Sequence, residues 1–183
     1  MMEKKKCKVK SCKREYCYYE QEVITPTFCE NCLEETNEIY FKSKYSSAIN
    51  EFIRNIGELL FYEELQLEEQ VVNGRPCLIR TDLRFDVPVT LDGLTNKELI
   101  DKNKSPRDAE TECQVMRLHH IGQKPDSPFA ELTKDEDLLY KGNAIHYPES
   151  TMIDRRKFSK ERNAHWRARL EKTVVENIEK SFS

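Results

Sequence analysis

Residues 118–128 read LHHIGQKPDSP, and this stretch places two adjacent histidines at the end of an apolar run. Residues 114–121 have the composition of a short β-strand, in which successive side chains point to opposite faces of a sheet. His119 and His120 are therefore expected to face opposite ways. One imidazole could bind a metal ion while its neighbour acts as a general base, because a histidine with a pKa of about 6.5 accepts protons near neutral pH.

A second polar cluster follows downstream, where residues 142–146 read GNAIH. Asn143 and His146 stand three residues apart and could complete a nitrogen and oxygen metal shell with open water positions. Such a centre suits phosphodiester hydrolysis, in which a divalent cation neutralises the phosphate while an imidazole activates water. Two adjacent histidines alone are more often structural, so the interpretation depends on the residues around them.

The flanking patterns predict a mixed structure. Apolar residues recur every three or four positions over 43–64 and predict one amphipathic helix. The Asn-Gly pair at 73–74 predicts a hairpin, residues 94–103 a short helix, and residues from about 151 to 178 a long helix. We divide the chain into a cysteine-rich segment (1–36), a connecting amphipathic helix (37–70) and a last domain (71–183).

Cysteines dominate the first segment in the pattern C-x4-C, sixteen residues, C-x2-C. Two short knuckles separated by a loop suit a tetrahedral structural Zn²⁺ held by four thiolates. The expected ligands are Cys7, Cys12, Cys29 and Cys32. Cys17 could replace one of them or remain a spare thiol. The alternative is that these cysteines are scattered small apolar residues.

Composition and charge narrow the class of protein. The chain has 183 residues, of which 38% are hydrophobic and 34% charged, and an odd number of cysteines, seven. No apolar run approaches the roughly 18 residues of a membrane span, and no secretion signal is seen at the start, so we expect a cytoplasmic protein with reduced thiols. The net charge is −3, yet Lys and Arg gather in residues 1–14 and 151–172. These basic ends could face a nucleic acid, or could simply be solvated helix faces.

Several motifs together resemble the LHH-type nucleases of the HNH/endonuclease VII, or ββα-metal, superfamily. The central ones are residues 118–128 and the AELT segment at 130–133. Upstream, RTDL at 80–83 and DGLTNKE at 92–98 resemble family elements; downstream, Gly142-Asn143, His146 and residues 153–169 resemble its end. The resemblance covers about residues 75–170. It excludes the cysteine segment, which is similar to zinc knuckles that sometimes precede such enzymes.

The resemblance implies an α+β fold: a ββα-metal, HNH-like nuclease core with a long C-terminal helix, preceded by the zinc-binding segment and the amphipathic helix. It also implies roles for the histidine pair, with His119 as a metal ligand and His120 as the general base. Asn143 or His146 would be a further ligand, although Asn143 could instead orient the base. The substrate-binding residues it suggests are Arg80, Gln123, Arg155 and Arg162. Members often carry a histidine after AELT, where this chain has Asp135-Glu136-Asp137. If Asp137 replaces that histidine, Mg²⁺ becomes a better candidate than Zn²⁺.

The function expected from these features is a metal-dependent endonuclease that uses Mg²⁺, Mn²⁺ or Zn²⁺. Its substrate would be DNA rather than RNA, cut with low sequence specificity. The family suggests a bacterial toxin neutralised by an immunity protein, while a phage-defence or mobile-element nuclease is equally open. A homodimer could form through the helix around residues 49–60, or the apolar face of this helix could equally pack in the core of its own chain. The alternative function is a non-catalytic, zinc-dependent nucleic-acid-binding protein.

Overall fold

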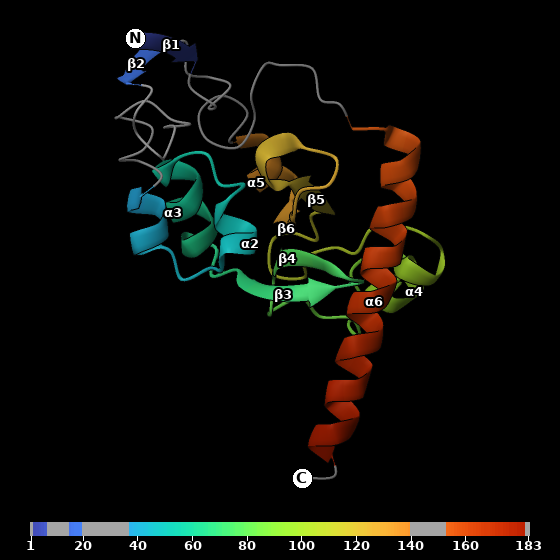
Figure 1. Ribbon diagram of the computed structural model, residues 1–183. Helices are drawn as coiled ribbons and strands as arrows, with labels where there is room; N and C mark the ends of the chain where they lie inside the picture. The colour runs from blue at the N-terminus through green and yellow to red at the C-terminus, as the bar shows by residue number, and fades with distance from the viewer. Residues whose placement is uncertain (1, 7–14, 20–36, 140–152, 182–183) are drawn as a thin grey trace.

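The computed structural model describes residues 2–6, 15–19, 37–139 and 153–181 (Figure 1). Its first elements are two antiparallel strands, β1 (Met2–Lys6) and β2 (Glu15–Tyr19), in which Lys4 pairs with Cys17. The zinc ligands expected from the sequence lie outside the described residues, and the zinc site stays a prediction. They are Cys7, Cys12, Cys29 and Cys32.

A four-stranded sheet forms the centre of the molecule, in the order β3-β4-β6-β5. Its strands are β3 (Glu68–Val72), β4 (Arg75–Ile79), β5 (Met116–His120) and β6 (Phe129–Thr133). The predicted hairpin is confirmed: Asn73 and Gly74 join β3 to β4 with φ angles of 50° and 75°, the left-handed backbone that a tight two-residue turn requires. β6 runs parallel to β4 and antiparallel to β5.

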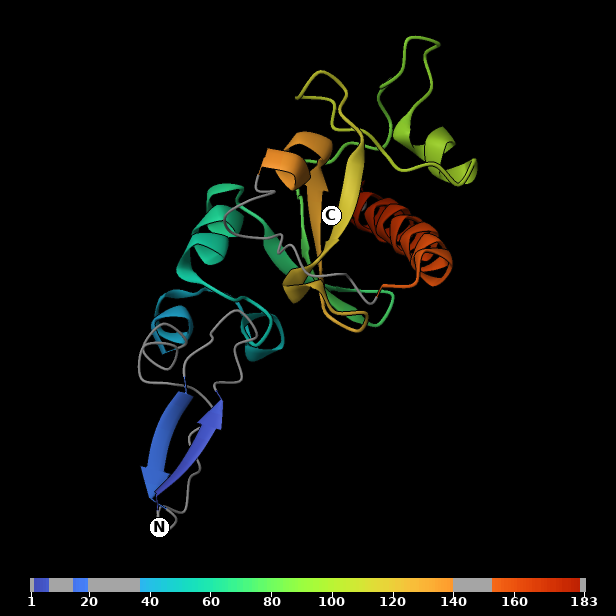
Figure 2. The same ribbon diagram turned by 90° about the horizontal axis from the view of Figure 1, so that it is seen from above.

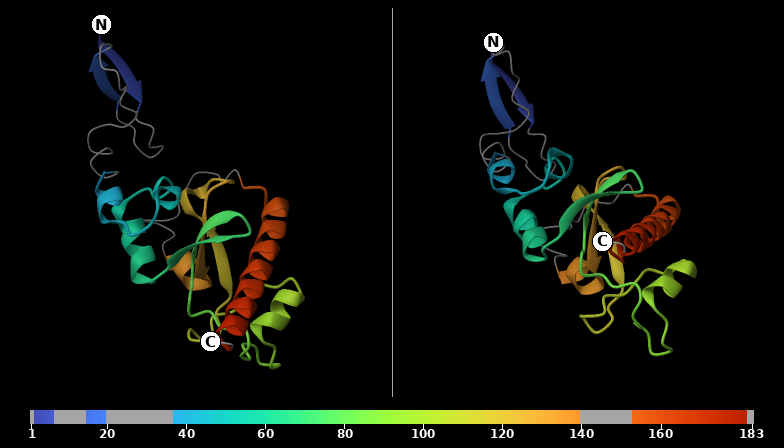
Figure 3. Two further views of the ribbon diagram at one scale, coloured as in Figure 1. Left: turned by 60° about the horizontal axis from the view of Figure 1, so that its bottom comes forward. Right: turned by 90° about the horizontal axis from the view of Figure 1, so that it is seen from below.

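Helices cover both faces of this sheet. On one face lie α2 (Ser47–Asn50) and α3 (Ile56–Glu64), and on the other lies the long helix α6 (Arg155–Ser181) (Figure 2). The short helix α4 (Asn96–Asp101) lies beside α6 (Figure 3). The expected α+β class with a long C-terminal helix is therefore confirmed.

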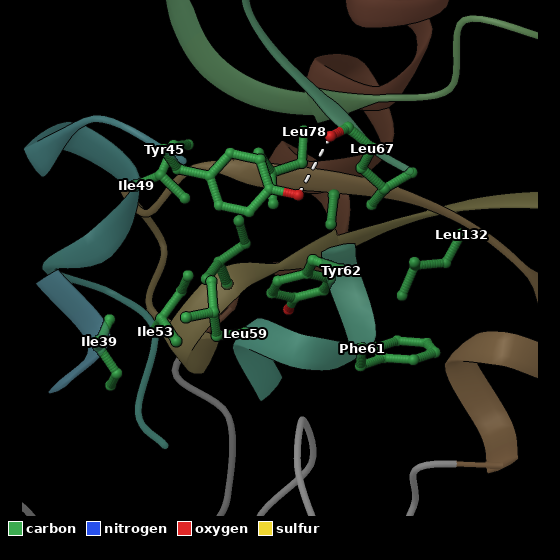
Figure 4. Close-up of a cluster of buried hydrophobic side chains, with 12 residues drawn as sticks. Ile39, Tyr45, Ile49, Ile53, Leu59, Phe61, Tyr62, Leu67, Leu78 and Leu132 are labelled. Atoms are coloured by element: carbon green, nitrogen blue, oxygen red, sulfur yellow. Dashed lines mark hydrogen bonds between the residues drawn. The ribbon is translucent and has the colours of Figure 1, made fainter. Parts of the chain in front are cut away.

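Each face of the sheet has its own apolar core. Leu59 and Tyr62 of α3 are fully buried in the first cluster, together with Leu78 and Leu132 from the sheet (Figure 4). The second cluster joins Met116 and Phe129 of the sheet to Trp166 of α6. Full burial of one such leucine contributes about 1.5–3 kcal/mol, so these two clusters fix the helices to the sheet.

The single amphipathic helix expected over residues 43–64 is wrong. Two helices form instead, because each has its own N-terminal cap: Ser46 accepts a hydrogen bond from the amide of Ala48, and Asn55 accepts one from the amide of Glu58. The chain between them turns through residues 51–55. Apolar side chains continue through the turn at helical spacing, and periodicity alone therefore conceals the break.

The N-terminus of α6 is set by Asp154, whose carboxylate accepts hydrogen bonds from the amides of Arg156 and Lys157 at 2.8 and 3.2 Å. An aspartate at this position satisfies otherwise unbonded amides and complements the helix dipole. Downstream, Trp166 is 1% exposed and anchors the middle of the helix on the sheet. Beyond that point the helix projects past the sheet (Figure 1).

Candidate functional site

The histidine pair forms the last two residues of β5. His119 lies opposite Ala130 and His120 opposite Phe129 in the antiparallel pairing with β6. The alternation predicted from the sequence holds, because the two side chains have neighbours on different faces of the sheet. His119 faces α5 (Lys134–Leu139), whereas His120 faces the first turn of α6.

On the α5 face, the Nδ1 atom of His119 lies 3.4 Å from a carboxylate oxygen of Asp137. Arg117 donates a hydrogen bond of 2.8 Å to the other oxygen of Asp137. The imidazole of His119 is 3% exposed, so a carboxylate and an imidazole meet in a protected position between strand and helix. The aspartate that stands where the family often has histidine is thus brought to the first histidine of the pair.

The helix that carries Asp137 is held tightly to β6. Thr133 and Glu136 form reciprocal bonds at its start: the amide of Thr133 donates to the Glu136 carboxylate at 2.6 Å, and the Thr133 hydroxyl accepts from the amide of Glu136 at 3.3 Å. Arg80 adds a 2.8 Å bond to the same carboxylate. These contacts fix the first turn of α5 and therefore the position of Asp137.

On the other face, His120 is packed among aromatic rings. Its ring centroid lies 4.7 Å from that of Phe129 and 4.8 Å from that of Phe158, and the residue is 4% exposed. Burial, followed by the nearby charge of Arg75 and then that of His119, lowers the pKa of His120 to about 4. The imidazole is therefore neutral at pH 7. Within the described residues, its Nε2 atom has no hydrogen-bond partner.

Charged residues surround the rings that cover His120. The Arg75 guanidinium stacks on Phe129, with 4.2 Å between its central carbon and the ring centroid, and lies 3.5 Å from Glu161 of α6. Lys157 lies 3.9 Å from Asp126 and 3.7 Å from Glu161. Ion pairs between α6, the β3–β4 hairpin and the loop after β5 therefore close over the aromatic cluster.

The turn after the histidine pair depends on a glycine. Gly122, within the 3₁₀ turn η1 (Ile121–Gln123), has a φ of 73°. A Cβ atom at this position would lie 2.8 Å from the carbonyl oxygen of Phe52. Only glycine adopts this backbone without strain and leaves room for Phe52, so the sequence HHIG reflects a close approach of two chain segments.

Glu131 is at the centre of a buried polar network that ties α6 to the sheet. Its carboxylate lies 2.7 Å from Nε2 of His165 and accepts hydrogen bonds of 2.8 Å from Nε of Arg169 and 3.0 Å from the amide of Arg80. Burial raises the pKa of Glu131, but the His165 hydrogen bond and the Arg169 charge outweigh it and hold the pKa below its usual range. No sequence pattern predicted this network.

His165 extends the network to a cysteine. Its Nδ1 atom lies 3.8 Å from the Cys77 sulfur, which is fully buried. Burial raises the pKa of the Cys77 thiol to about 12, so the sulfur stays protonated and is a poor nucleophile. The network is therefore structural.

The four residues expected to bind substrate lie in different settings. The Arg80 side chain, 11% exposed, is paired with carboxylates: it lies 3.2 Å from Asp82 and 2.8 Å from Glu136. Gln123 is half-buried in η1, Arg155 is exposed at the start of α6, and Arg162 is half-buried one turn beyond Phe158. Arg155 and Arg162 thus share α6 with the cover of His120, whereas Arg80 is bound to α5.

In the part of the chain that the structure describes, two side chains could bind the metal ion that the family resemblance implies. They are the imidazole of His119 and the carboxylate of Asp137, a mixed nitrogen and oxygen set that fits a divalent cation such as Mn²⁺, Mg²⁺ or Zn²⁺. Asn143 and His146 lie outside the described residues. Among the residues described, no group of three or more His, Cys, Asp or Glu side chains could hold a metal.

A β-hairpin followed by a helix, with a histidine pair ending the first strand, defines this centre as a ββα unit. Residues 95–172 match the model of the LHH family, described as a nuclease of the HNH/ENDO VII superfamily with conserved LHH. The matched stretch contains β5, β6, α5 and most of α6, so the resemblance seen in the sequence is confirmed over residues 95–172. No curated protein and no solved structure matches the chain. In the described ranges, no helix is long and apolar enough to cross a membrane.

Proposed function

We propose that this chain is a metal-dependent endonuclease that hydrolyses phosphodiester bonds in DNA with little sequence preference. The observation that carries the proposal is the arrangement at the end of β5. His119 meets Asp137 of α5, while His120 occupies the opposite face of the same strand end. This arrangement lies inside the stretch that matches the LHH nuclease family.

His119 and Asp137 would hold the cation, with Asn143 or His146 as the further ligand that the family resemblance suggests. When bound, a divalent cation supplies positive charge at the phosphate and at the leaving oxygen. Arg117, bonded to the outer oxygen of Asp137, orients that carboxylate. A carboxylate in place of the usual histidine favours Mg²⁺ or Mn²⁺ over Zn²⁺.

His120 serves as the general base. Its lowered pKa keeps the imidazole neutral and able to accept a proton at pH 7. In the hydrolytic step it takes one proton from the attacking water, the water oxygen forms a bond to phosphorus, and the ester oxygen leaves and acquires a proton from solvent. Because Phe158 covers the imidazole, substrate reaches His120 only when the first turn of α6 moves aside.

The basic face of α6 holds the nucleic-acid backbone. Arg155, Arg156 and Lys160 are exposed on its first two turns, directly after Asp154. Phosphate contacts of this kind position a duplex but carry no sequence information, which accounts for the low sequence preference that we propose.

The test is cleavage of supercoiled plasmid by the purified chain with Mg²⁺, Mn²⁺ or Zn²⁺, beside EDTA. The proposal predicts metal-dependent nicking that is lost in His120→Ala and retained in Lys134→Ala, an exposed matched control on α5. Nicking by His120→Ala at the wild-type rate would contradict the role of the base. Nicking that persists in EDTA would contradict the metal requirement.

A second function is favoured by one observation, the burial of His120 beneath Phe158. If α6 never moves aside, the fold would bind nucleic acid without cutting it, as a zinc-dependent binding protein. This alternative predicts salt-sensitive DNA binding without cleavage under any divalent cation. Zinc analysis of the purified chain tests the expected site at Cys7, Cys12, Cys29 and Cys32 in either case.

The biological setting we propose is that of a bacterial toxin or a phage-defence nuclease. A toxin would require an immunity protein to protect the producing cell. A homodimer would be detected by sedimentation of the purified chain. The toxin and defence roles rest on the family resemblance, and the homodimer rests on the apolar spacing around residues 49–60.

A further inference from the structure

A hollow of about 970 Å³ lies on the α4 side of α6, away from the histidine pair. It is bounded by residues 88–94, the end of α4, the loop 103–107, residues 112–115 and Arg162 of α6. Figures 1 and 3 show α4 and α6 side by side, and the hollow opens next to their contact. Its lining combines an apolar wall with three cations, Lys104, Arg107 and Arg162.

The three cations are available to an anion. Arg107 donates to the carbonyl oxygen of Cys113 at 2.8 Å, and Arg162 contacts the side-chain oxygen of Asn163 at 3.2 Å. Neither bond neutralises a positive charge, and Lys104 is exposed. No carboxylate of the described residues forms an ion pair with any of the three.

Two carboxylates also line the hollow. Asp92 and Glu112 are both exposed at its rim. With Lys104, Arg107 and Arg162 against these two carboxylates, the lining carries one more positive than negative charge.

Side-chain hydrogen bonds fix the conformation of residues 107–115, which form one wall of the hollow. The Asp108 side chain, 3% exposed, accepts hydrogen bonds from the amide of Glu110 and the hydroxyl of Thr111. Asn96, fully buried, binds both the amide and the carbonyl oxygen of Arg107. These bonds hold the wall in one conformation before any ligand arrives.

The same wall contains strained backbone. Glu112 and Cys113 are consecutive residues with φ angles of 48° and 58°, in the left-handed region that side chains other than glycine disfavour. Strain of this kind persists only where the surrounding structure imposes it, and it gathers at binding sites. The strained pair turns the carbonyl oxygen of Cys113 onto Arg107, and so places that guanidinium at the hollow.

The hollow and the histidine site share one element, α6, which contributes Arg162 to the hollow and Phe158 to the cover of His120. Phe158 contacts His120, and Arg162 lies four residues further on, which is about 6 Å along the helix axis. Successive phosphates of one DNA strand advance about 3.4 Å along the duplex axis. A strand whose cleaved bond lies at His120 would thus reach the level of Arg162, at the edge of the hollow, within roughly two or three nucleotides.

We propose that this hollow binds one nucleotide of the substrate strand, two or three nucleotides from the cleaved bond, with its phosphate between Lys104 and Arg162 and its base against the apolar wall. This inference rests on the proposed function and names a contact of the same enzyme outside its catalytic centre. A free nucleotide offers the same chemistry, but the position of Arg162 one turn beyond the cover of His120 favours a strand.

The test is the binding of a fluorescently labelled 20-nucleotide duplex and of its single strand, measured by anisotropy in the His120→Ala background so that no cleavage occurs. Lys104→Glu and Arg162→Glu should each weaken binding about 10-fold near 0.1 M salt and reduce the salt dependence by about one phosphate contact. Lys102→Glu is the matched control, because it makes the same charge change two residues away and does not line the hollow. It should change affinity less than about 2-fold.

Equal losses of DNA affinity in Lys102→Glu and Lys104→Glu would overturn the inference, because they would show that Lys104 acts only through the general positive charge of this surface. A mononucleotide that binds as tightly as the labelled strands would also overturn it. Thermal melting of Lys104→Glu and Arg162→Glu at wild-type temperatures confirms that any lost binding is local.

The inference and the proposed function fail separately. If the wild-type chain nicks plasmid and both variants bind DNA as well as wild type, the nuclease proposal stands and the proposed nucleotide site in the hollow is wrong. If Lys104→Glu and Arg162→Glu lose binding but the wild-type chain does not nick plasmid, the hollow is a nucleic-acid site and the nuclease proposal is wrong.

Discussion

Replacement of Glu131 by glutamine should destabilise the fold strongly. The carboxylate is fully buried and receives three contacts, from His165, Arg169 and the amide of Arg80, at 2.7, 2.8 and 3.0 Å. Glutamine keeps the shape, but it removes the charge and turns an NH₂ group toward a donor. Breaking a buried ion pair in this way costs about 3–5 kcal/mol, a large part of the roughly 5–15 kcal/mol that stabilises a domain.

The assay is thermal and urea unfolding of Glu131→Gln beside wild type. At about 2–4 °C per kcal/mol for a chain of this size, the melting temperature should fall by roughly 6–20 °C. Glu38→Gln is the control: Glu38 is exposed and, among the described residues, forms an ion pair with Lys42 alone, so the substitution should cost less than about 0.5 kcal/mol. If Glu131→Gln lowers the free energy of unfolding by less than about 1 kcal/mol, the Glu131 network does not anchor α6.

The same pair of proteins gives the pH dependence. The pKa of Glu131 is held below its usual range in the folded chain, so the contribution of its charge to stability is fully present above the pKa of the unfolded chain and is lost as the pH falls through the folded value. The stability difference between wild type and Glu131→Gln should therefore be constant near neutral pH and shrink below about pH 4.5. A stability difference that is unchanged at pH 3 would contradict the conclusion that Glu131 is ionised in the folded chain.

Three further predictions concern the site. Asp137→Asn should weaken Mn²⁺ binding at least about 10-fold in calorimetry, because a neutral amide replaces a charged ligand. Asp135→Asn, an exposed change on the same helix, should leave Mn²⁺ affinity unchanged. Equal affinities of the two variants would exclude Asp137 as a ligand. Phe158→Ala should expose His120 and speed its modification by diethylpyrocarbonate several-fold, and an unchanged rate would show that the ring is no cover. Gly122→Ala should lower the free energy of unfolding by about 1–3 kcal/mol, since its φ of 73° and the Phe52 carbonyl oxygen both oppose a Cβ; a wild-type melting temperature would contradict this close approach.

Local patterns predicted the elements that local physics determines. The Asn-Gly turn requires left-handed backbone and appears where expected, and the alternation of a strand sends His119 and His120 to opposite faces. The amphipathic spacing over 43–64 misled, because the caps at Ser46 and Asn55 interrupt one helix without interrupting its apolar face. Caps of this kind were visible in the sequence as Ser and Asn before apolar runs.

Contacts between distant segments were beyond reach of these patterns. The Glu131 network joins residues 34 and 38 positions apart, and nothing in their local sequence indicates the partners. Arg80 was expected on a phosphate, yet its guanidinium binds Glu136, 56 positions away. Asp137 was the exception, because the family pattern marked its position in advance and the structure places it 3.4 Å from His119.

The measurement that tests the central claim most directly is chemical rescue of His120→Ala. Wild type and variant are compared on supercoiled plasmid with Mn²⁺, with and without added imidazole. The account predicts that His120→Ala loses at least about 100-fold in nicking rate and that imidazole, which fits the space left beside Phe129 and Phe158, restores part of it. Wild-type nicking by His120→Ala without imidazole would contradict the account.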